Sequence, residues 1–173
     1  ENIGSVIIHE TVHIWQRRDP EFFYDLYSKW KFKKYEKIIN SKKFINVNRY
    51  NPDGVDLNWC FKDNKNNEYM LLSIYKDDAA NISHVNLIGI EIEKLGSVPI
   101  IPPVPNIQKL DEISDFSSFF GNLGGNNYHP NELSAEIISI HIVNQMNVKN
   151  SKDEMSPAEL IYSSHFKKEY MNM

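Results

Sequence analysis

Cysteine is nearly absent from the chain, and this limits how the chain could be cross-linked or could bind a metal. Cys60 is the only cysteine among 173 residues. An intrachain disulfide and a cysteine-based zinc cluster are therefore both excluded within one chain. Any metal ion must be bound by histidines and carboxylates. A single thiol, with no signal-peptide pattern at the start of the chain, favours the cytoplasm as the compartment.

Long apolar runs and clustered positive charge are also missing. No stretch approaches the roughly 18 consecutive apolar residues that a membrane helix needs. The formal net charge is −4, and we interpret the densest group of lysines, from Lys29 to Lys37, as a solvated helix face. We therefore expect neither a membrane nor a nucleic acid among the partners, since both need clustered positive charge or apolar length.

The remaining composition is that of a soluble globular domain. Hydrophobic residues make up 41% of the chain and charged residues 24%. A chain of this length can bury one sizeable core but is short for two. We therefore expect a single domain over residues 1–173.

Hydrophobic periodicity predicts helices at both ends of the chain. Apolar residues recur at helical spacing from Ile3 onward, and Asp19 followed by Pro20 has the pattern of an N-cap and a first helical residue. Ser156 and Glu159 have the spacing of a capping box. The predicted helices cover about 3–18, 20–29, 31–40, 110–120, 130–148 and 157–170.

The hydrophobic period changes to two in the middle of the chain. Residues 44–50 and 55–62 alternate around Asn51-Pro52-Asp53-Gly54, which predicts a hairpin, and further strands over 68–75 and 85–93 extend it into an antiparallel meander. Four prolines in 97–109 predict an irregular extended segment, and the glycines in 121–127 predict a loop. The expected fold class is therefore α+β.

The segment HETVH, residues 9–13, has the pattern of a metal site. Residues four apart lie on the same face of a helix, so His9 and His13 can point at one ion. Glu10 lies near that ion without binding it, where a base would take a proton from a metal-bound water. The alternative is an ordinary polar helix face that happens to carry two histidines.

A catalytic zinc site needs a third protein ligand. The segment YHPNELSAE, residues 128–136, places Glu132 just inside a predicted helix and Glu136 one turn later. Glu132 could bind the zinc, and Glu136 could accept a hydrogen bond from a ligating histidine. Glu136 as the ligand in place of Glu132 is the main competing assignment. A glutamate favoured by the helix dipole would also explain Glu132 without any metal.

Other polar residues near these motifs have weaker signals. Tyr128 and His129 precede the second motif helix, and His129 could stabilise an oxyanion on a substrate carbonyl; a packed or solvated loop histidine is the alternative. His141 should point away from the site, because it lies nine residues after Glu132 and about 180° around the helix. Gln16 is expected to pair with a carboxylate and to have no catalytic role.

The two motifs together resemble those of the gluzincin metallopeptidases, the thermolysin-like group, whose signature is HExxH followed downstream by a segment like NELSAE. The resemblance implies a zincin-like fold in which an active-site helix and a glutamate helix pack face to face. It implies Zn²⁺ bound by His9, His13 and Glu132, with Glu10 as general base and Glu136 supporting a ligand. The implied partner is a peptide or protein substrate. More loosely, HETVHIWQRR, NPDG and HPNELSAE resemble segments of metallopeptidase-like proteins of large DNA viruses and marine microbes.

Two features depart from the gluzincin pattern. Between His13 and Glu132 lie 118 residues, which makes the meander an insertion between the two metal helices. Gluzincins have a β-sheet before the HExxH helix, so either an upstream segment is missing or the meander supplies the edge strand that receives the peptide. Two other classes stay open: a non-catalytic zinc-binding or protein-interaction module, and a structural helical protein without metal.

Overall fold

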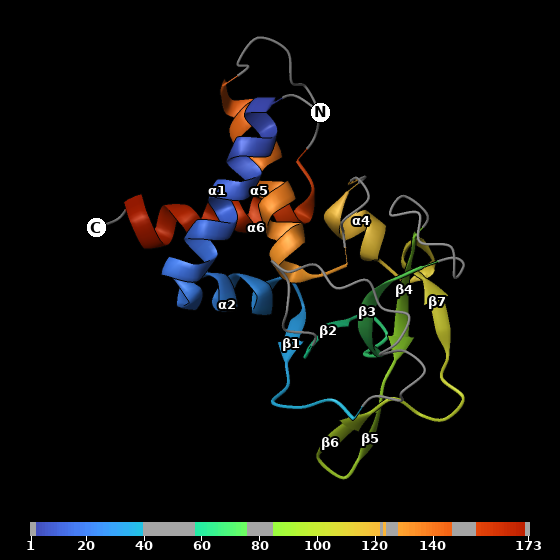
Figure 1. The fold of residues 1–173 in the computed structure, drawn as a ribbon. Helices are drawn as coiled ribbons and strands as arrows, with labels where there is room; N and C mark the ends of the chain where they lie inside the picture. Colours follow the sequence, from blue (N-terminus) through green and yellow to red (C-terminus); the bar gives the residue numbers. More distant parts are fainter. Residues whose placement is uncertain are drawn as a thin grey trace.

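The chain folds into a helical half and a sheet half (Figure 1). The structure is a computed structural model, and it describes residues 3–39, 58–75, 85–121, 123, 128–146 and 155–171. The helical half contains α1 (Ile3–Arg18), α2 (Pro20–Lys29), α5 (Pro130–Met146), α6 (Pro157–Phe166) and the π-helical turn η2 (Lys167–Met171). Helices combined with antiparallel strands confirm the predicted α+β class.

The sheet half is built on a five-stranded antiparallel sheet with the strand order β1-β2-β3-β4-β7. Its strands are β1 (Phe32–Lys34), β2 (Trp59–Lys62), β3 (Glu68–Tyr75), β4 (Val85–Glu91) and β7 (Ile107–Lys109). A separate two-stranded ribbon pairs β5 (Glu93–Leu95) with β6 (Val98–Ile100). The short helices η1 (Leu110–Glu112) and α4 (Phe116–Phe120) follow β7 in the chain.

Side chains alternate between the two faces of this sheet, and each face covers a different core. Phe61 and Tyr69 are paired across β2 and β3 and belong to the cluster shared with the helical half. Their neighbours Cys60 and Met70 are also paired, but they belong to a second cluster on the other face. The period of two along a strand explains this division. Because the first cluster also includes residues of α2, α4, α5 and α6, both halves share one core.

Local capping explains where two of the helices begin. The carboxylate of Asp19 accepts a hydrogen bond from the backbone N–H of Phe22, and Pro20 occupies the start of α2. Ser156 and Glu159 form the predicted capping box of α6. These helices are confirmed, as are α1 and α5. None of the helices in the described part of the chain combines the length and the apolar character needed to cross a bilayer.

The first half of α5 is buried on most sides. Leu133, Ile137 and Ile138 are fully buried, and α1 packs along this helix (Figure 1). A helix that is apolar on most sides lies inside a protein, because no face of it gains from contact with water. The start of α5 is therefore held in place by packing, and Glu132 with it.

The helix predicted over 31–40 is wrong. Lys31 adopts a positive φ of 65°, after which the chain enters β1 and pairs with β2. Phe32 is buried in this strand, whereas Lys33 and Lys34 are exposed. Pairing with a distant strand outweighed the local helical preference of the lysines. Lys33 and Lys34 are solvated as expected, but they lie on a strand and not on a helix.

Some of the other predicted strands are confirmed, and some lie outside the described residues. The strands over 68–75 and 85–93 are confirmed as β3 and β4, although β4 ends at Glu91. The strand predicted over 44–50 and the turn at 51–54 lie outside the described residues.

The proline-rich segment 97–109 is not irregular throughout, because it contains β6 and β7. Pro99 lies opposite Lys94 in the two-stranded ribbon, where a missing N–H is tolerated. The helix predicted over 110–120 is divided into η1 and α4, and Asp115 between them adopts a φ of 65°. Most of the loop predicted over 121–127 lies outside the described residues.

Replacing Leu133 with alanine should lower the free energy of unfolding by about 2–5 kcal/mol, because the buried side chain would leave a cavity beside the start of α5. Leu160→Ala is the control, since Leu160 on α6 is 51% exposed. It should cost less than about 1 kcal/mol. Urea unfolding followed by circular dichroism measures both. Equal losses would contradict the placement of α5 in the core.

Candidate metal centre

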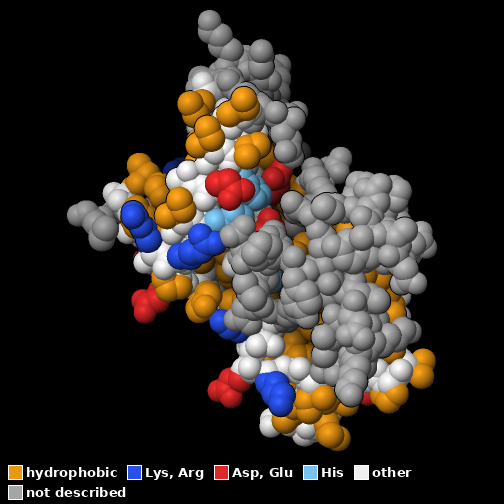
Figure 2. All heavy atoms as spheres, viewed as in Figure 1, with side chains coloured by type: hydrophobic (Ala, Val, Ile, Leu, Met, Phe, Trp, Pro, Cys, Tyr) orange, Lys and Arg blue, Asp and Glu red, His pale blue; other side chains and the backbone are white. Residues whose placement is uncertain are grey.

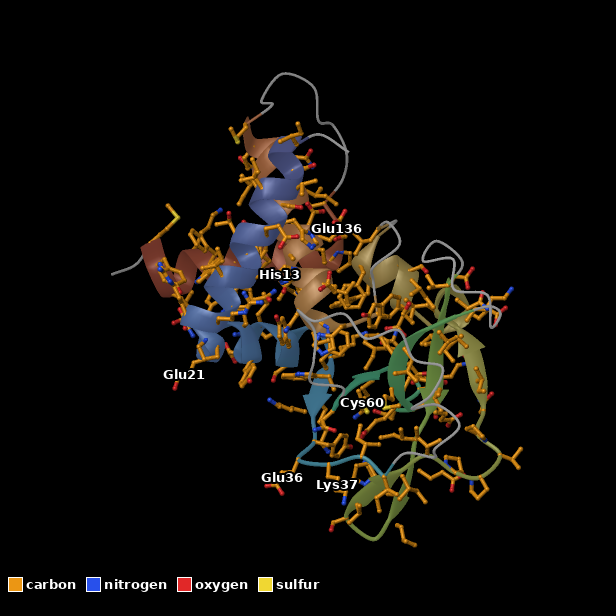
Figure 3. The ribbon with its side chains drawn as sticks, viewed as in Figure 1. His13, Glu21, Glu36, Lys37, Cys60 and Glu136 are labelled. Carbon is orange, nitrogen blue, oxygen red and sulfur yellow. The ribbon has the colours of Figure 1, made fainter. Side chains whose placement is uncertain are left out.

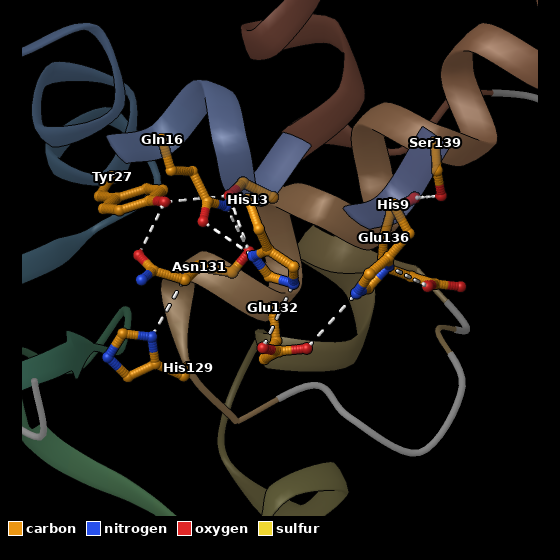
Figure 4. Close-up of polar contacts among 10 residues, drawn as sticks. His9, His13, Gln16, Tyr27, His129, Asn131, Glu132, Glu136 and Ser139 are labelled. Atoms are coloured by element: carbon orange, nitrogen blue, oxygen red, sulfur yellow. Dashed lines mark hydrogen bonds and ion pairs between the residues drawn. The ribbon is translucent and has the colours of Figure 1, made fainter. Parts of the chain in front are cut away.

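The face of α1 that packs on α5 carries both histidines of the HETVH segment. His13 is 3% exposed and His9 is partly buried. Their ring centroids are 4.9 Å apart, with the ring planes at 78° to each other. Because the two residues are one helical turn apart, both rings extend toward α5 on the same side (Figure 4).

The first turn of α5 carries Glu132 toward these rings. The backbone N–H of Leu133 donates to the carbonyl of His129, so the helix begins just before Glu132. The Glu132 side chain is 2% exposed. A carboxylate in this position benefits from the partial positive charge at the helix N-terminus. Helix capping and core packing thus place a buried negative charge opposite two imidazoles.

Two of the distances between these three side chains are close to those expected between ligands of one metal ion. Nε2 of His9 lies 3.5 Å from Oε2 of Glu132, and Nε2 of His13 lies 3.6 Å from Oε1. With one ligand atom from each residue, all three atoms lie within 4.8 Å of one another. Metal–ligand distances of about 2.0–2.2 Å around a tetrahedral zinc give ligand separations of about 3.3–3.6 Å. Direct charge-assisted N–H···O bonds are shorter, about 2.7–2.9 Å. Each histidine is therefore at ligand separation from one oxygen of Glu132, and the three side chains form a donor set that could hold one ion.

Glu136 contacts the other nitrogen of His9. Its Oε2 lies 3.4 Å from Nδ1 of His9, one helical turn beyond Glu132. The two carboxylates thus flank one imidazole, with Glu132 on the side that faces His13 and Glu136 on the opposite side (Figure 4). This geometry favours Glu132 over Glu136 as the third ligand.

The two carboxylates change the acid–base behaviour of His9. The contact with Glu132, followed by that with Glu136, raises the pKa of His9 to about 10, against the opposing effect of partial burial. Without a metal, a proton on His9 supplies the positive charge that the two carboxylates attract. A divalent cation bound at the same point would displace that proton.

Gln16 is the residue at this site that sequence reasoning missed. Its Oε1 lies 2.9 Å from Nδ1 of His13, and its Nε2 donates to the backbone carbonyl of Asn131 at 2.8 Å and to Oγ of Ser134 at 2.9 Å. The expected carboxylate partner is therefore wrong. The signal in the sequence was the spacing of three residues between His13 and Gln16, which places both on one helix face.

A pocket of about 320 Å³ opens beside His9 on the outer side of α1 and α5. Glu10, the predicted general base, is exposed and lines this pocket together with His9 and Glu136. Figure 2 shows acidic side chains gathered around histidine atoms on this face, with apolar side chains next to them. The remaining lining residues are Ser5, Val6, Ser139, Ile140, Val143 and Asn144.

His129, predicted as a second catalytic residue, is not brought to this pocket. Its ring is 2% exposed, and its Nδ1 accepts a hydrogen bond from the backbone N–H of Asn131. In Figure 4 the ring points away from Glu132. These contacts match the structural alternative, a histidine packed at the start of a helix. His141 points away from the site as predicted, with its ring edge against Tyr162 of α6.

Comparison with protein-family models, with curated proteins and with solved structures found no match to this chain. The relation to the gluzincins stays a prediction from the two motifs. Support for a function comes instead from the arrangement of His9, His13 and Glu132 and from the pocket beside them.

The metal-free protein should lose stability as the pH rises from about 6.5 to about 10. A histidine whose pKa is higher in the folded chain stabilises it fully below the unfolded pKa of about 6.5. This contribution disappears as the pH passes through the folded pKa of His9, about 10. Chelator-treated protein unfolded in urea across this range measures the effect.

Two variants separate His9 from other groups that titrate in the same range. His9→Gln should remove this part of the pH dependence, whereas His141→Gln, on the other side of α5, should keep it. Identical pH profiles for the wild type and His9→Gln would show that the two carboxylates do not act on His9.

Proposed function

We propose that the protein is a zinc-dependent metallopeptidase whose two metal helices have a zincin-like arrangement. One observation carries this proposal: His9 and His13 from α1 and Glu132 from α5 converge so that one ligand atom from each lies within 4.8 Å of the others. The resemblance of HETVH and NELSAE to the gluzincin motifs agrees with the same three residues.

The donor set is compatible with zinc. Two imidazole nitrogens and one carboxylate form one of the ligand sets of catalytic zinc sites, in which a fourth position stays open. Hard ions such as Mg²⁺ and Ca²⁺ prefer sites made of oxygen atoms. Of the three proposed ligands only His9 lines the outer pocket, which lies beside the metal centre on the side of Glu136.

Zinc held by these residues would supply a Lewis acid that lowers the pKa of a water molecule and polarises a carbonyl group. Glu10 follows His9 in the chain and lines the same pocket, with its side chain exposed. Its carboxylate is therefore the group that accepts the proton of the attacking water and returns it to the leaving amine. The carboxylate of Glu136 lies 3.4 Å from Nδ1 of His9, where it would accept the hydrogen of that nitrogen and direct Nε2 toward the ion.

The pocket supports a peptide as the substrate. Its volume of about 320 Å³ lies at the lower end of the range for ligand sites. Val6, Ile140 and Val143 provide apolar contact, while Ser5 and Asn144 provide polar groups for a peptide backbone. The proposed reaction is hydrolysis of a peptide bond held across this pocket.

Replacing Glu132 with alanine should abolish stoichiometric zinc binding. Removing a residue that only supports a ligand already costs about 10–100-fold in metal affinity, so loss of a ligand should cost more. Zinc content by mass spectrometry and affinity by chelator competition measure the change. Glu112→Ala removes an exposed glutamate on η1 and should bind zinc as the wild type does. Full zinc occupancy in Glu132→Ala would remove Glu132 from the ligand set.

Replacing Glu10 with glutamine should lower peptide hydrolysis by about 10²–10⁴-fold while zinc stays bound, because the amide cannot accept the proton. A fluorogenic peptide library measures turnover. Glu21→Gln is the matched control, since Glu21 is an exposed helical glutamate that Figure 3 places well away from His13 and Glu136.

The same assay separates the proposed enzyme from its main rival. A zinc-loaded wild type that cleaves no peptide would identify a non-catalytic zinc-binding module. Wild-type turnover in Glu10→Gln would refute the role of Glu10 as the base.

A further inference from the structure

A buried network of hydrogen bonds joins three helices behind His13 (Figure 4). Gln16 of α1 contacts Asn131 and Ser134 of α5, and the hydroxyl of Tyr27 in α2 lies 3.0 Å from both Oδ1 of Asn131 and Oγ of Ser134. Tyr27 and Ser134 are fully buried, and Gln16 is 8% exposed. Polar groups buried this deeply keep the hydrogen bonds that they form, because losing one leaves a group without compensation.

The partners of Gln16 determine which way its amide faces. The backbone carbonyl of Asn131 can only accept a hydrogen bond, so the NH₂ group of Gln16 must point at it, at 2.8 Å. The same NH₂ group donates to Ser134, at 2.9 Å. The carbonyl oxygen of the amide therefore faces the other way, toward the ring of His13.

The orientation of this amide in turn determines the tautomer of His13. The amide oxygen can only accept, so Nδ1 of His13, at 2.9 Å, must carry the hydrogen. A neutral ring then has its lone pair on Nε2. Nε2 is the atom that lies 3.6 Å from Glu132, on the side where the ligands converge.

We infer that Gln16 is a positioning residue of the metal centre, which holds His13 in the tautomer and rotation that present Nε2 to the ion. The inference rests on the proposed metal site. The inference adds to the three ligands a supporting residue, Gln16, whose amide contacts both α1 and α5. Because Gln16 donates to the carbonyl of Asn131, the residue before Glu132, one amide holds both the ring of His13 and the backbone next to the third ligand.

An amide fits this position better than a carboxylate would. A carboxylate at residue 16 would face the carbonyl of Asn131 with no hydrogen to donate, and its charge would be buried. His9 shows the contrast, because its supporting group is the carboxylate of Glu136 beside the open pocket. The charged supporting group, Glu136, therefore lies near solvent, whereas the neutral supporting group, Gln16, lies in the core.

The tautomer of His13 in the metal-free wild type tests the inference without any zinc. Long-range ¹H–¹⁵N correlation spectra, recorded where the ring is neutral, distinguish a hydrogen on Nδ1 from one on Nε2. The expected result is a hydrogen on Nδ1. A hydrogen on Nε2 would overturn the inference.

Gln16→Leu removes both the acceptor and the donors while keeping a side chain of similar size. We expect His13 to lose its preference for the Nδ1–H tautomer and zinc affinity to fall by about 10–100-fold. Gln108→Leu is the matched control, since it makes the same replacement on β7 of the sheet, where Gln108 donates to the hydroxyl of Tyr69 at 3.4 Å and does not contact His13. It should keep the tautomer and the zinc affinity of the wild type even where it lowers the melting temperature. A folded Gln16→Leu with wild-type affinity would overturn the inference.

If Gln16→Leu does not fold, Ser134→Ala tests the role of Gln16 in its place. It removes one of the two acceptors that hold the amide, so zinc affinity should fall, but by less than in Gln16→Leu. Unchanged affinity and an unchanged tautomer signal in Ser134→Ala would count against the inference. None of these measurements uses peptide hydrolysis, so a zinc-binding protein without peptidase activity would contradict the proposed function and leave the role of Gln16 standing.

Discussion

The buried negative charge of Glu132 is the constraint on which the rest of the site depends. Its side chain is 2% exposed in the first turn of α5. A carboxylate this deeply buried is costly unless positive charge or hydrogen-bond donors surround it. The N-terminus of α5 offers partial positive charge, and the rings of His9 and His13 lie 3.5 and 3.6 Å from its two oxygens. A proton on His9, or a metal ion between the three side chains, would supply the remaining positive charge that compensates the carboxylate of Glu132.

The two histidines meet this constraint from different surroundings. His9 lies at the edge of the pocket with a second carboxylate, Glu136, at its other nitrogen. His13 lies in the interior, with the neutral amide of Gln16 at its other nitrogen. The charged supporting group thus lies on the side that opens to the pocket, and the neutral amide lies on the side that packs against the core. Under the proposed function, this division would hold the metal ligands still and leave the outer side open to a water molecule and a peptide.

Local signals predicted the helices that carry this site but not all of the fold around them. Capping by Asp19 and Ser156 and helical periodicity place α1, α2, α5 and α6 correctly, because these signals act within a few residues. The failure at 31–40 has a clear cause. Phe32 becomes part of a strand through pairing with β2, whose residues lie far along the chain. The helix and strand propensities of a segment carry no information about a pairing strand that is distant in the sequence.

The sequence by itself determined that His9 and His13 share one face of a helix and that Glu132 and Glu136 share another, because a spacing of four residues is a local property of helices. Only the tertiary structure decided that the two pairs meet. Between His13 and Glu132 lie 118 residues, and their approach depends on the packing of α1 against α5. The same packing turned Gln16 toward a histidine and a backbone carbonyl. Contacts between helices depend on how buried surfaces fit together, which the periodicity of each helix does not specify.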